Sequence, residues 1–148
     1  MENHKGLLVF GSTTGSTRIL ALAVKSGLVE AGIPTLVRNA RRARVVELLK
    51  FPLIFFGCST WEDGCIQRDF REFMQRWGGL RLDGIKVAVF GAGSRAYPRY
   101  CQAVDDLERE LVDRGAILLG PSFRGDGSVY GLRPQIQKWA QDLAVHGT

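Results

Sequence analysis

The sequence predicts an α/β protein in which a parallel sheet carries helices on both faces. Strand-like and helix-like patterns alternate along all 148 residues, which is the order that consecutive βα units produce. The run 53–58 is apolar on both faces, as a central strand of a parallel sheet should be. Glycine-containing loops follow three of the expected strands. In this fold class ligands bind at the carboxyl ends of the strands, so these loops are the places to look for a site.

Length and composition fit one domain spanning 1–148. With 45% hydrophobic and 24% charged residues, the chain is long enough to bury a core. No apolar stretch is long enough to cross a bilayer, and residues 1–5 lack the apolar core of a signal peptide. We therefore expect a cytoplasmic protein that does not enter a membrane.

The net charge of +5 and the pI of about 9.4 favour acidic partners. Much of the excess lies in the run 38–44, where no aromatic residue stands among the arginines. Surfaces that stack nucleic-acid bases combine basic and aromatic residues, so this run does not predict nucleic-acid binding. A solvated basic loop is the simpler interpretation.

Cysteine and histidine usage argues against metal and general-base chemistry. Cys58, Cys65 and Cys101 show neither C-x-x-C spacing nor a neighbouring histidine, so we expect thiols and not a disulfide frame or a metal site. His4 and His146 lie near the ends of the chain, which leaves little for general-base catalysis.

The first half of the chain opens with an apolar strand at 7–11. A helix is predicted over 16–31, because its apolar residues recur at near-helical spacing and Gly32 provides a stop. A short strand at 35–38 follows, and after the basic turn comes a brief helical piece at 45–50.

The middle of the chain is the most apolar part. The buried strand is followed by a helix that carries Phe70, Phe73 and Trp77 at positions i, i+3 and i+7. The next strand is predicted at 86–90 and again ends in a glycine-rich loop.

The last part supplies two helices and one strand. A helix at 100–114 has one apolar stripe and stops at a glycine, and a strand follows at 117–119. A final helix is predicted to begin at Pro134 and carries Ile136, Trp139, Ala140 and Leu143.

The loop after the first strand has the composition of a phosphate socket. The first N–H groups of a helix lack partners within the helix, and its dipole adds positive charge there. No lysine follows Gly15, which excludes the triphosphate loop G-x-x-x-x-G-K-[ST]. A cluster of helix-capping hydroxyls without any ligand stays open, since Ser and Thr cap helices in either case. The candidate phosphate ligands are Ser12, Thr13, Thr14, Gly15, Ser16 and Thr17.

The other two loops each contain an aromatic residue. Trp61 stands in the polar loop 59–64, and Tyr97 in the loop after the strand 86–90; each is a candidate flat surface for a ring system. The alternatives are a Trp folded over a helix and a Tyr half-buried with its hydroxyl in water. The third loop also matches G-x-G-x-x-A. That fingerprint belongs on the first βα turn, and here Pro98 delays the helix start, so we do not predict a dinucleotide site.

Together the three loops resemble those of short-chain flavodoxins, and the resemblance covers nearly the whole chain. Ser12-Thr13-Thr14-Gly15-Ser16-Thr17 resembles the family's phosphate loop S-T-T-G-N-T. Gly57-Cys58-Ser59-Thr60-Trp61 resembles its first flavin loop, and Tyr97 with residues 100–105 resembles its second flavin loop and the helix after it.

The resemblance implies a five-stranded sheet of order 2-1-3-4-5 that binds FMN. It places the phosphate on the first loop and the isoalloxazine between Trp61 and Tyr97. The implied role is low-potential, one-electron transfer between redox enzymes, with no substrate of its own. The implied cofactor-binding residues are Ser12, Thr13, Thr14, Gly15, Ser16, Thr17, Ser59, Thr60, Trp61, Glu62, Gly64, Gly91, Gly93, Ser94, Tyr97, Tyr100 and Cys101.

Several positions depart from the family pattern. Ser16 stands where Asn is usual, and Glu62 where many members have Gly. Ser94 and Arg95 replace a loop that is usually acidic, and the positive net charge is opposite to the family's acidic norm. These departures bear on redox tuning and on the partner. We expect a monomer whose redox partners present acidic docking surfaces.

Two other classes of function remain open. The first is a flavodoxin-like binding module that recognises an acidic partner and has little or no redox role. The second is a flavin-dependent enzyme such as a quinone reductase. Binding of FMN to the apo-protein separates the electron carrier from the binding module.

Overall fold

A parallel sheet of order β2-β1-β3-β4-β5 forms the centre of the molecule, as predicted. The computed structural model describes residues 4–11, 15–59, 66–93 and 101–147. All strand pairs among these residues are parallel. The strands are β1 (Gly6–Gly11), β2 (Thr35–Asn39), β3 (Leu53–Ser59), β4 (Lys86–Gly93), β5 (Ile117–Leu118) and β6 (Phe123–Asp126).

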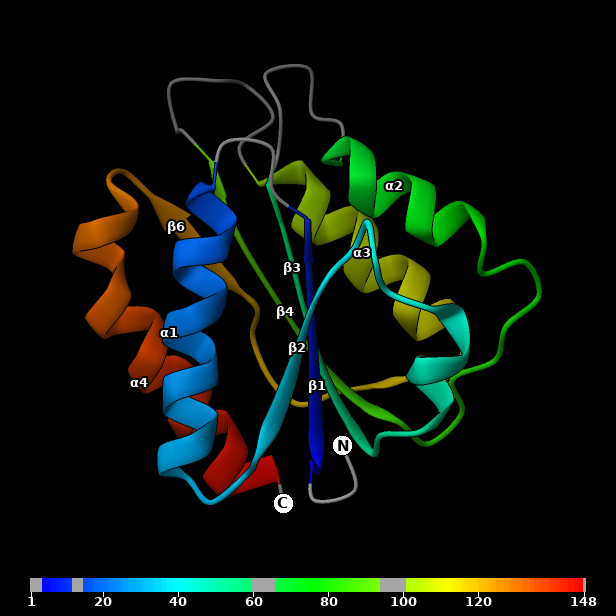
Figure 1. Cartoon of the computed structure of the whole chain (residues 1–148), viewed down its shortest axis with the longest axis horizontal. Helices are drawn as coiled ribbons and strands as arrows, with labels where there is room; N and C mark the ends of the chain where they lie inside the picture. Colours follow the sequence, from blue (N-terminus) through cyan, green and yellow to red (C-terminus); the bar gives the residue numbers. More distant parts are fainter. Residues whose placement is uncertain (1–3, 12–14, 60–65, 94–100, 148) are drawn as a thin grey trace.

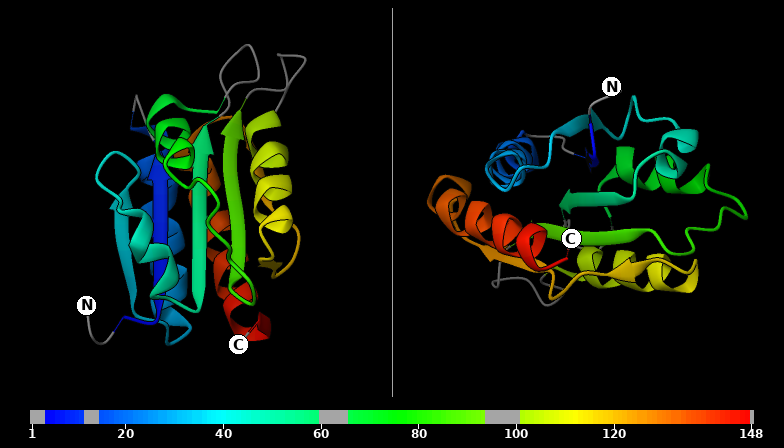
Figure 2. Two further views of the ribbon diagram at one scale, coloured as in Figure 1. Left: turned by 90° about the vertical axis from the view of Figure 1, so that its right-hand side faces the viewer. Right: turned by 90° about the horizontal axis from the view of Figure 1, so that it is seen from below.

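Helices cover both faces of the sheet and produce three layers (Figures 1 and 2). On one face lie α1 (Ser16–Glu30) and α4 (Val129–Gly147). On the other lie the 3₁₀-helix η1 (Val45–Leu49), α2 (Arg68–Gln75) and α3 (Gln102–Asp113). No helix within the described ranges is long and apolar enough to cross a membrane.

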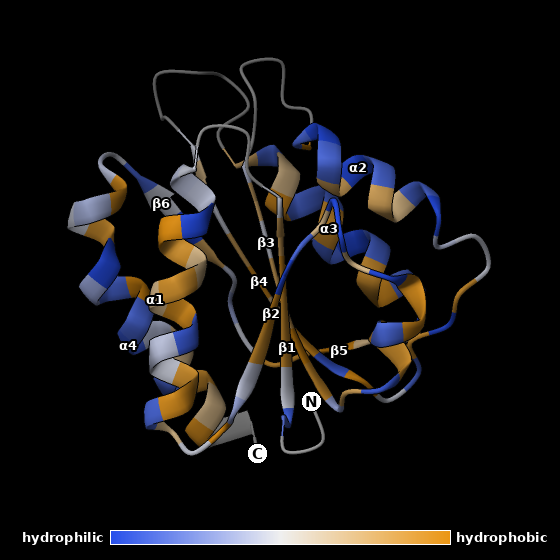
Figure 3. Cartoon of the chain, viewed as in Figure 1, coloured by the Kyte–Doolittle hydropathy of each residue, from blue (hydrophilic) through white to orange (hydrophobic). Residues whose placement is uncertain are grey.

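The strands bury side chains on both faces because successive residues point to opposite sides. Leu7 and Val9 join the core under α2 and α3, whereas Leu8 and Phe10 join the core under α1 and α4. The central strands β1, β3 and β4 are accordingly hydrophobic over most of their length, and the outward sides of the helices are largely polar (Figure 3). This two-sided burial explains the continuous apolar run of β3.

The helices α1 and α4 pack unusually closely at one glycine. A Cβ atom added to Gly27 would lie 2.3 Å from the backbone oxygen of Gln137. The same region is joined by a hydrogen bond of 3.0 Å from Gln137 Nε2 to Glu30 Oε1. Gly27 therefore lets the two helix backbones approach.

The fifth position of the sheet is filled by two segments, which the sequence did not predict. β5 pairs with the first residues of β4, and β6 pairs with its last residues. Two hydrogen bonds hold the segment between β5 and β6 in place. Trp139 Nε1 donates to the Pro121 carbonyl at 2.9 Å, and Ser122 Oγ donates to the Glu108 carboxylate at 2.8 Å. The pattern of β6, Phe-Arg-Gly-Asp, is too short and polar to indicate a strand by itself.

The predicted start of the last helix at Pro134 is wrong. α4 begins at Val129, and the Leu132 N–H donates to the Ser128 carbonyl at 3.1 Å. Proline lacks the N–H that would bond to the carbonyl four residues before it, and its ring crowds that carbonyl. In the second turn the lost bond is one near the helix end, and the turn before it still forms. The helix with Phe70 and Phe73 ends at Gln75, and Trp77 lies just beyond it, buried against Phe73 with ring centroids 5.6 Å apart.

Candidate functional site

The three predicted loops leave the sheet from its carboxyl edge and from three neighbouring strands. Gly11 of β1 pairs with Cys58 of β3, and Cys58 pairs with Gly91 of β4. The ends of β1, β3 and β4 therefore lie side by side, as Figure 1 shows at the top of the sheet. A ligand above the end of β3 would lie beside the ends of all three strands, which is the position expected for this fold class.

Many predicted site residues fall outside the described part of the chain. They are Ser12, Thr13, Thr14, Thr60, Trp61, Glu62, Gly64, Ser94, Tyr97 and Tyr100. The described ones are Gly15, Ser16, Thr17, Ser59, Gly91, Gly93 and Cys101.

The start of α1 has the geometry of an anion site. Gly15 occupies the N-cap position with φ of +90°, and an added Cβ would meet no heavy atom within 4 Å. Within the described chain, no side chain caps this helix and its first turn contains no acidic residue. The positive end of the helix dipole favours an anion at this place, and the residues present fit a phosphate group.

The hydroxyls of Thr17 and Ser59 connect the first loop to the second. Thr17 is 1% exposed, and its Oγ1 is hydrogen-bonded to Ser59 Oγ. Thr17 belongs to the first turn of α1 and Ser59 is the last residue of β3. The pair therefore fixes the helix start against the neighbouring strand end, whatever further bonds the two hydroxyls make to a ligand.

Removing this hydroxyl pair should show coupling between the two loops. Thr17→Val and Ser59→Ala should each lower the free energy of unfolding by about 1–2 kcal/mol, and the double variant should lose less than the sum. Urea unfolding of the four proteins measures the coupling. Ser26→Ala is the matched control, because the exposed Ser26 hydroxyl bonds only within α1, to the Leu22 carbonyl. Strictly additive losses would contradict a direct interaction.

Gln67 supports the site from below and was missed by the sequence analysis. It is 1% exposed; its Oε1 accepts from the Phe70 N–H at 3.0 Å, and its own N–H donates to the Ser59 carbonyl at 3.2 Å. A Cβ on Gly11 would lie 2.2 Å from this Oε1. Gln67 thus caps α2 and anchors the return of the second loop. Glutamine is not among the preferred N-cap residues, so no sequence signal marked it.

The cysteines at the edge of the sheet are buried. Cys58 is fully buried, and desolvation, then the neighbouring Cys101 and Asp106, raise the pKa of its thiol to about 12. At neutral pH this thiol stays protonated and is a poor nucleophile.

Cys101 lies at the N-cap of α3 with φ of 53°, and among the described residues it is the non-glycine with a positive φ. Its side chain packs in the core under α2 and α3. Positive φ at a non-glycine residue is a strained conformation that is found at ligand sites. A contact of Cys101 with a ligand stays a prediction.

Gly91 and Gly93, which were expected in the third loop, belong to β4, because this strand does not end at residue 90 but continues to Gly93, where it pairs with β6. A Cβ on Gly91 would lie 2.6 Å from the Cys58 backbone oxygen and 2.7 Å from a Val104 methyl carbon. Gly93 ends β4, opposite Asp126 of β6. Gly91 is therefore required by the close approach of β3 and α3, and its part in ligand binding stays a prediction.

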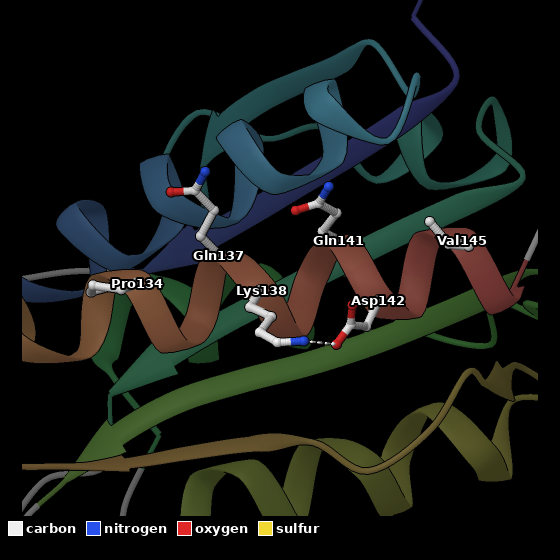
Figure 4. A pocket seen from close by; sticks show the side chains of 6 residues that line it. All are labelled: Pro134, Gln137, Lys138, Gln141, Asp142 and Val145. Carbon is white, nitrogen blue, oxygen red and sulfur yellow. Dashed lines mark hydrogen bonds and ion pairs between the residues drawn. The ribbon is translucent and has the colours of Figure 1, made fainter.

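A different hollow of about 620 Å³ runs along α4, away from the carboxyl edge (Figure 4). Its lining residues are polar and exposed for the most part, and an ion pair joins Lys138 to Asp142 at 3.2 Å. None of the predicted site residues lines it. The hollow is a shallow groove on the helix surface, and it does not compete with the strand-end site.

The fold and the carboxyl-edge site together define an α/β protein of the class that binds the phosphate of a nucleotide cofactor at a helix start. The sequence model described as flavodoxin matches residues 8–139. The chain belongs to the flavodoxin family, whose members bind FMN and carry electrons.

Individual relatives agree with this assignment. The chain is 35% identical over 143 residues to a flavodoxin of Maridesulfovibrio salexigens, covering 95% of this chain and 97% of that protein. The crystal structure of oxidised flavodoxin 2 from Bacillus cereus superposes with a TM-score of 0.89 at 29% identity, covering 95% of this chain and 97% of the other. Over 112 residues the chain is also 29% identical to the sulfite reductase flavoprotein component of Cronobacter sakazakii, and the matched part makes up 19% of that protein. Flavodoxin-like sequences thus also occur as parts of flavoprotein enzymes.

Proposed function

We propose that this protein binds FMN at the carboxyl edge of its sheet and shuttles single electrons at low potential between redox proteins. The observation that carries the proposal is the convergence of the Gly15 helix start, the Thr17–Ser59 hydroxyl pair and the end of β4 on one edge of the sheet. When bound, FMN supplies the chemistry of accepting and donating single electrons.

In this proposal the protein contributes binding and orientation. The start of α1 holds the phosphate, with Gly15, Ser16 and the hydroxyls of the preceding loop as donors. The second and third loops hold the ring system between Trp61 and Tyr97. The Thr17–Ser59 pair holds the start of α1 against the end of β3, and the buried Gln67 binds the Ser59 carbonyl at that same strand end. The partners are redox proteins with acidic docking surfaces, since the chain carries a net charge of +5.

The test is reconstitution followed by electron delivery. Apo-protein should bind one FMN, and the reduced protein should then pass electrons to an acidic one-electron acceptor haem protein. The rate should fall as salt rises, because exposed charges more than about 8–10 Å apart are screened at physiological ionic strength. If the protein binds no FMN, it is a binding module and not an electron carrier. A protein that binds FMN but oxidises NADPH or reduces a quinone catalytically would be an enzyme.

A further inference from the structure

We propose that the surface formed by Arg42, Arg44, Val46, Leu49 and Lys50, here called the η1 surface, docks a protein partner that presents carboxylates around an apolar centre. The inference deepens the proposed function by giving the partner's chemistry and the place where it binds. The inference rests on the proposed function in one respect, because that function makes the partner a redox protein.

The first observation is the outward apolar pair on η1. A 3₁₀-helix has three residues per turn, so residues i and i+3 lie on the same side. Val45 and Leu48 pack inward on the core, whereas Val46 and Leu49 are 50% and 57% exposed. Two neighbouring apolar side chains therefore face outward from the same element.

The second observation is the charge around this pair. A hollow of about 340 Å³ lies between the end of β2 and η1; its described lining includes Arg38, Arg42, Arg44 and Lys50, and one carboxylate, Glu47. Glu47 is already engaged, because its Oε2 lies 3.2 Å from Arg38 Nε and its Oε1 accepts from the Arg44 N–H at 3.0 Å.

The remaining cations stay available. Arg42, Arg44 and Lys50 are exposed, and none forms an ion pair with a described residue. Their positive charge is therefore not offset locally. It can be offset by an incoming acidic surface, which favours specific association.

The third observation is that the turn carrying these arginines is held in place. Asn39 caps it: its Oδ1 accepts from the Arg41 N–H at 3.0 Å, and its carbonyl accepts from the N–H groups of Arg42 at 2.8 Å and Ala43 at 3.0 Å. On the other side, Arg76 Nη2 donates to the Ala43 carbonyl at 3.4 Å. A backbone ordered before binding loses less conformational entropy when a partner arrives.

The composition of the η1 surface selects among possible occupants. A protein interface combines an apolar centre with a charged rim, and a small anion makes no use of exposed Val46 and Leu49. The stretch 37–50 contains no aromatic residue on which bases could stack. At five residues, η1 is far shorter than the amphipathic helices that lie in membrane interfaces.

The position suits delivery of electrons to or from the candidate site. β2 ends beside β1, where the Ala40 N–H donates to the Phe10 carbonyl at 2.7 Å. The turn after β2 reaches the level at which β1 ends, and η1 follows on the side of α2 and α3 (Figure 1). η1 itself lies lower, beside the sheet (Figure 1). The turn after β2 therefore brings the arginine end of the η1 surface near the edge from which the site loops leave.

The experiment uses the full ¹⁵N-labelled chain with FMN and two synthetic peptides of equal negative charge. One peptide has a Leu-Phe centre flanked by Glu and Asp, and the other is all Glu. We expect amide shifts confined to 38–50 and at least 10-fold tighter binding of the peptide with the apolar centre. The double variant Arg42→Glu, Arg44→Glu should bind the peptide with the apolar centre at least 10-fold more weakly. The double variant Val46→Ser, Leu49→Ser should bind that peptide no more tightly than it binds the all-Glu peptide.

The matched control reverses two exposed charges on the opposite face, Lys25→Glu with Arg133→Glu, and should leave peptide binding within 2-fold. Equal weakening by this control, or shifts centred elsewhere, overturns the proposal. So does tighter binding of phosphatidylserine vesicles or single-stranded DNA through the same residues. Self-association in sedimentation experiments that Arg42→Glu with Arg44→Glu abolishes would assign the surface to a second copy.

The same variants separate this proposal from the proposed function. All of them should keep the FMN affinity of the parent protein, because none lies on the site loops. If the parent binds the peptide on the η1 surface but binds no FMN, the electron-carrier proposal fails and the docking surface stands. If FMN binds and the peptide does not, the docking surface fails and the carrier proposal stands.

Discussion

Riboflavin should bind this protein roughly 100-fold to 10,000-fold more weakly than FMN. The difference corresponds to losing about two charge-assisted hydrogen bonds of 1.5–3 kcal/mol each, made by the loop that enters α1. The phosphate is the group that the Gly15 helix start fits, and riboflavin lacks it. Quenching of flavin fluorescence on titration with apo-protein measures both affinities.

A single substitution shows whether this loop is responsible. Thr14→Ala should weaken FMN binding by about 1–2 kcal/mol and leave riboflavin binding unchanged, because in the proposed function the threonine hydroxyl donates to the phosphate. Inorganic phosphate should compete with FMN but not with riboflavin. Equal affinities of the two flavins would remove the argument for a phosphate site at the start of α1.

Gly27→Ala should lower the free energy of unfolding by about 1–3 kcal/mol, although alanine is the better helix former. The added methyl group would lie 2.3 Å from the Gln137 carbonyl oxygen, so α1 and α4 must separate along their contact. Because a neighbouring backbone cannot rotate away as a side chain can, the strain spreads along both helices. Urea unfolding followed by circular dichroism measures the loss.

Gly131→Ala is the matched substitution with the opposite sign. Gly131 also lies in a helix, it is exposed, and an added Cβ would meet nothing within 4 Å. Alanine there should stabilise the protein by about 0.5–1 kcal/mol through helix propensity and reduced freedom of the unfolded chain. If both variants are stabilised, the close approach of α1 and α4 at Gly27 does not constrain the fold.

The elements that the sequence predicted correctly are those with a strong local signal. The run that became β3 is apolar throughout because both faces are covered. The helix after the first loop begins at Ser16, as predicted, with Gly15 at its N-cap position. Strand order does not follow from periodicity. It followed from the resemblance of three loops to one family.

The features that the sequence did not predict depend on contacts between distant segments. The cap on α2 comes from Gln67, whose role appears only when the end of β1 is packed against it. The short strand β6 exists because β4 continues past β5 and offers it hydrogen-bonding groups. The hydroxyls of Thr17 and Ser59 are 42 residues apart, and nothing local to either indicates the other.

The break in the fifth strand also affects how the protein behaves at high concentration. A long open sheet edge can recruit a strand from another molecule and begin aggregation. Along the side formed by β5 and β6, the described backbone offers runs of two and four residues, separated by residues 119–122. Arg124 on the second run is held by Asp105 and Glu108, which places charge on that edge. The interruption therefore keeps this edge from acting as a template for intermolecular β-pairing.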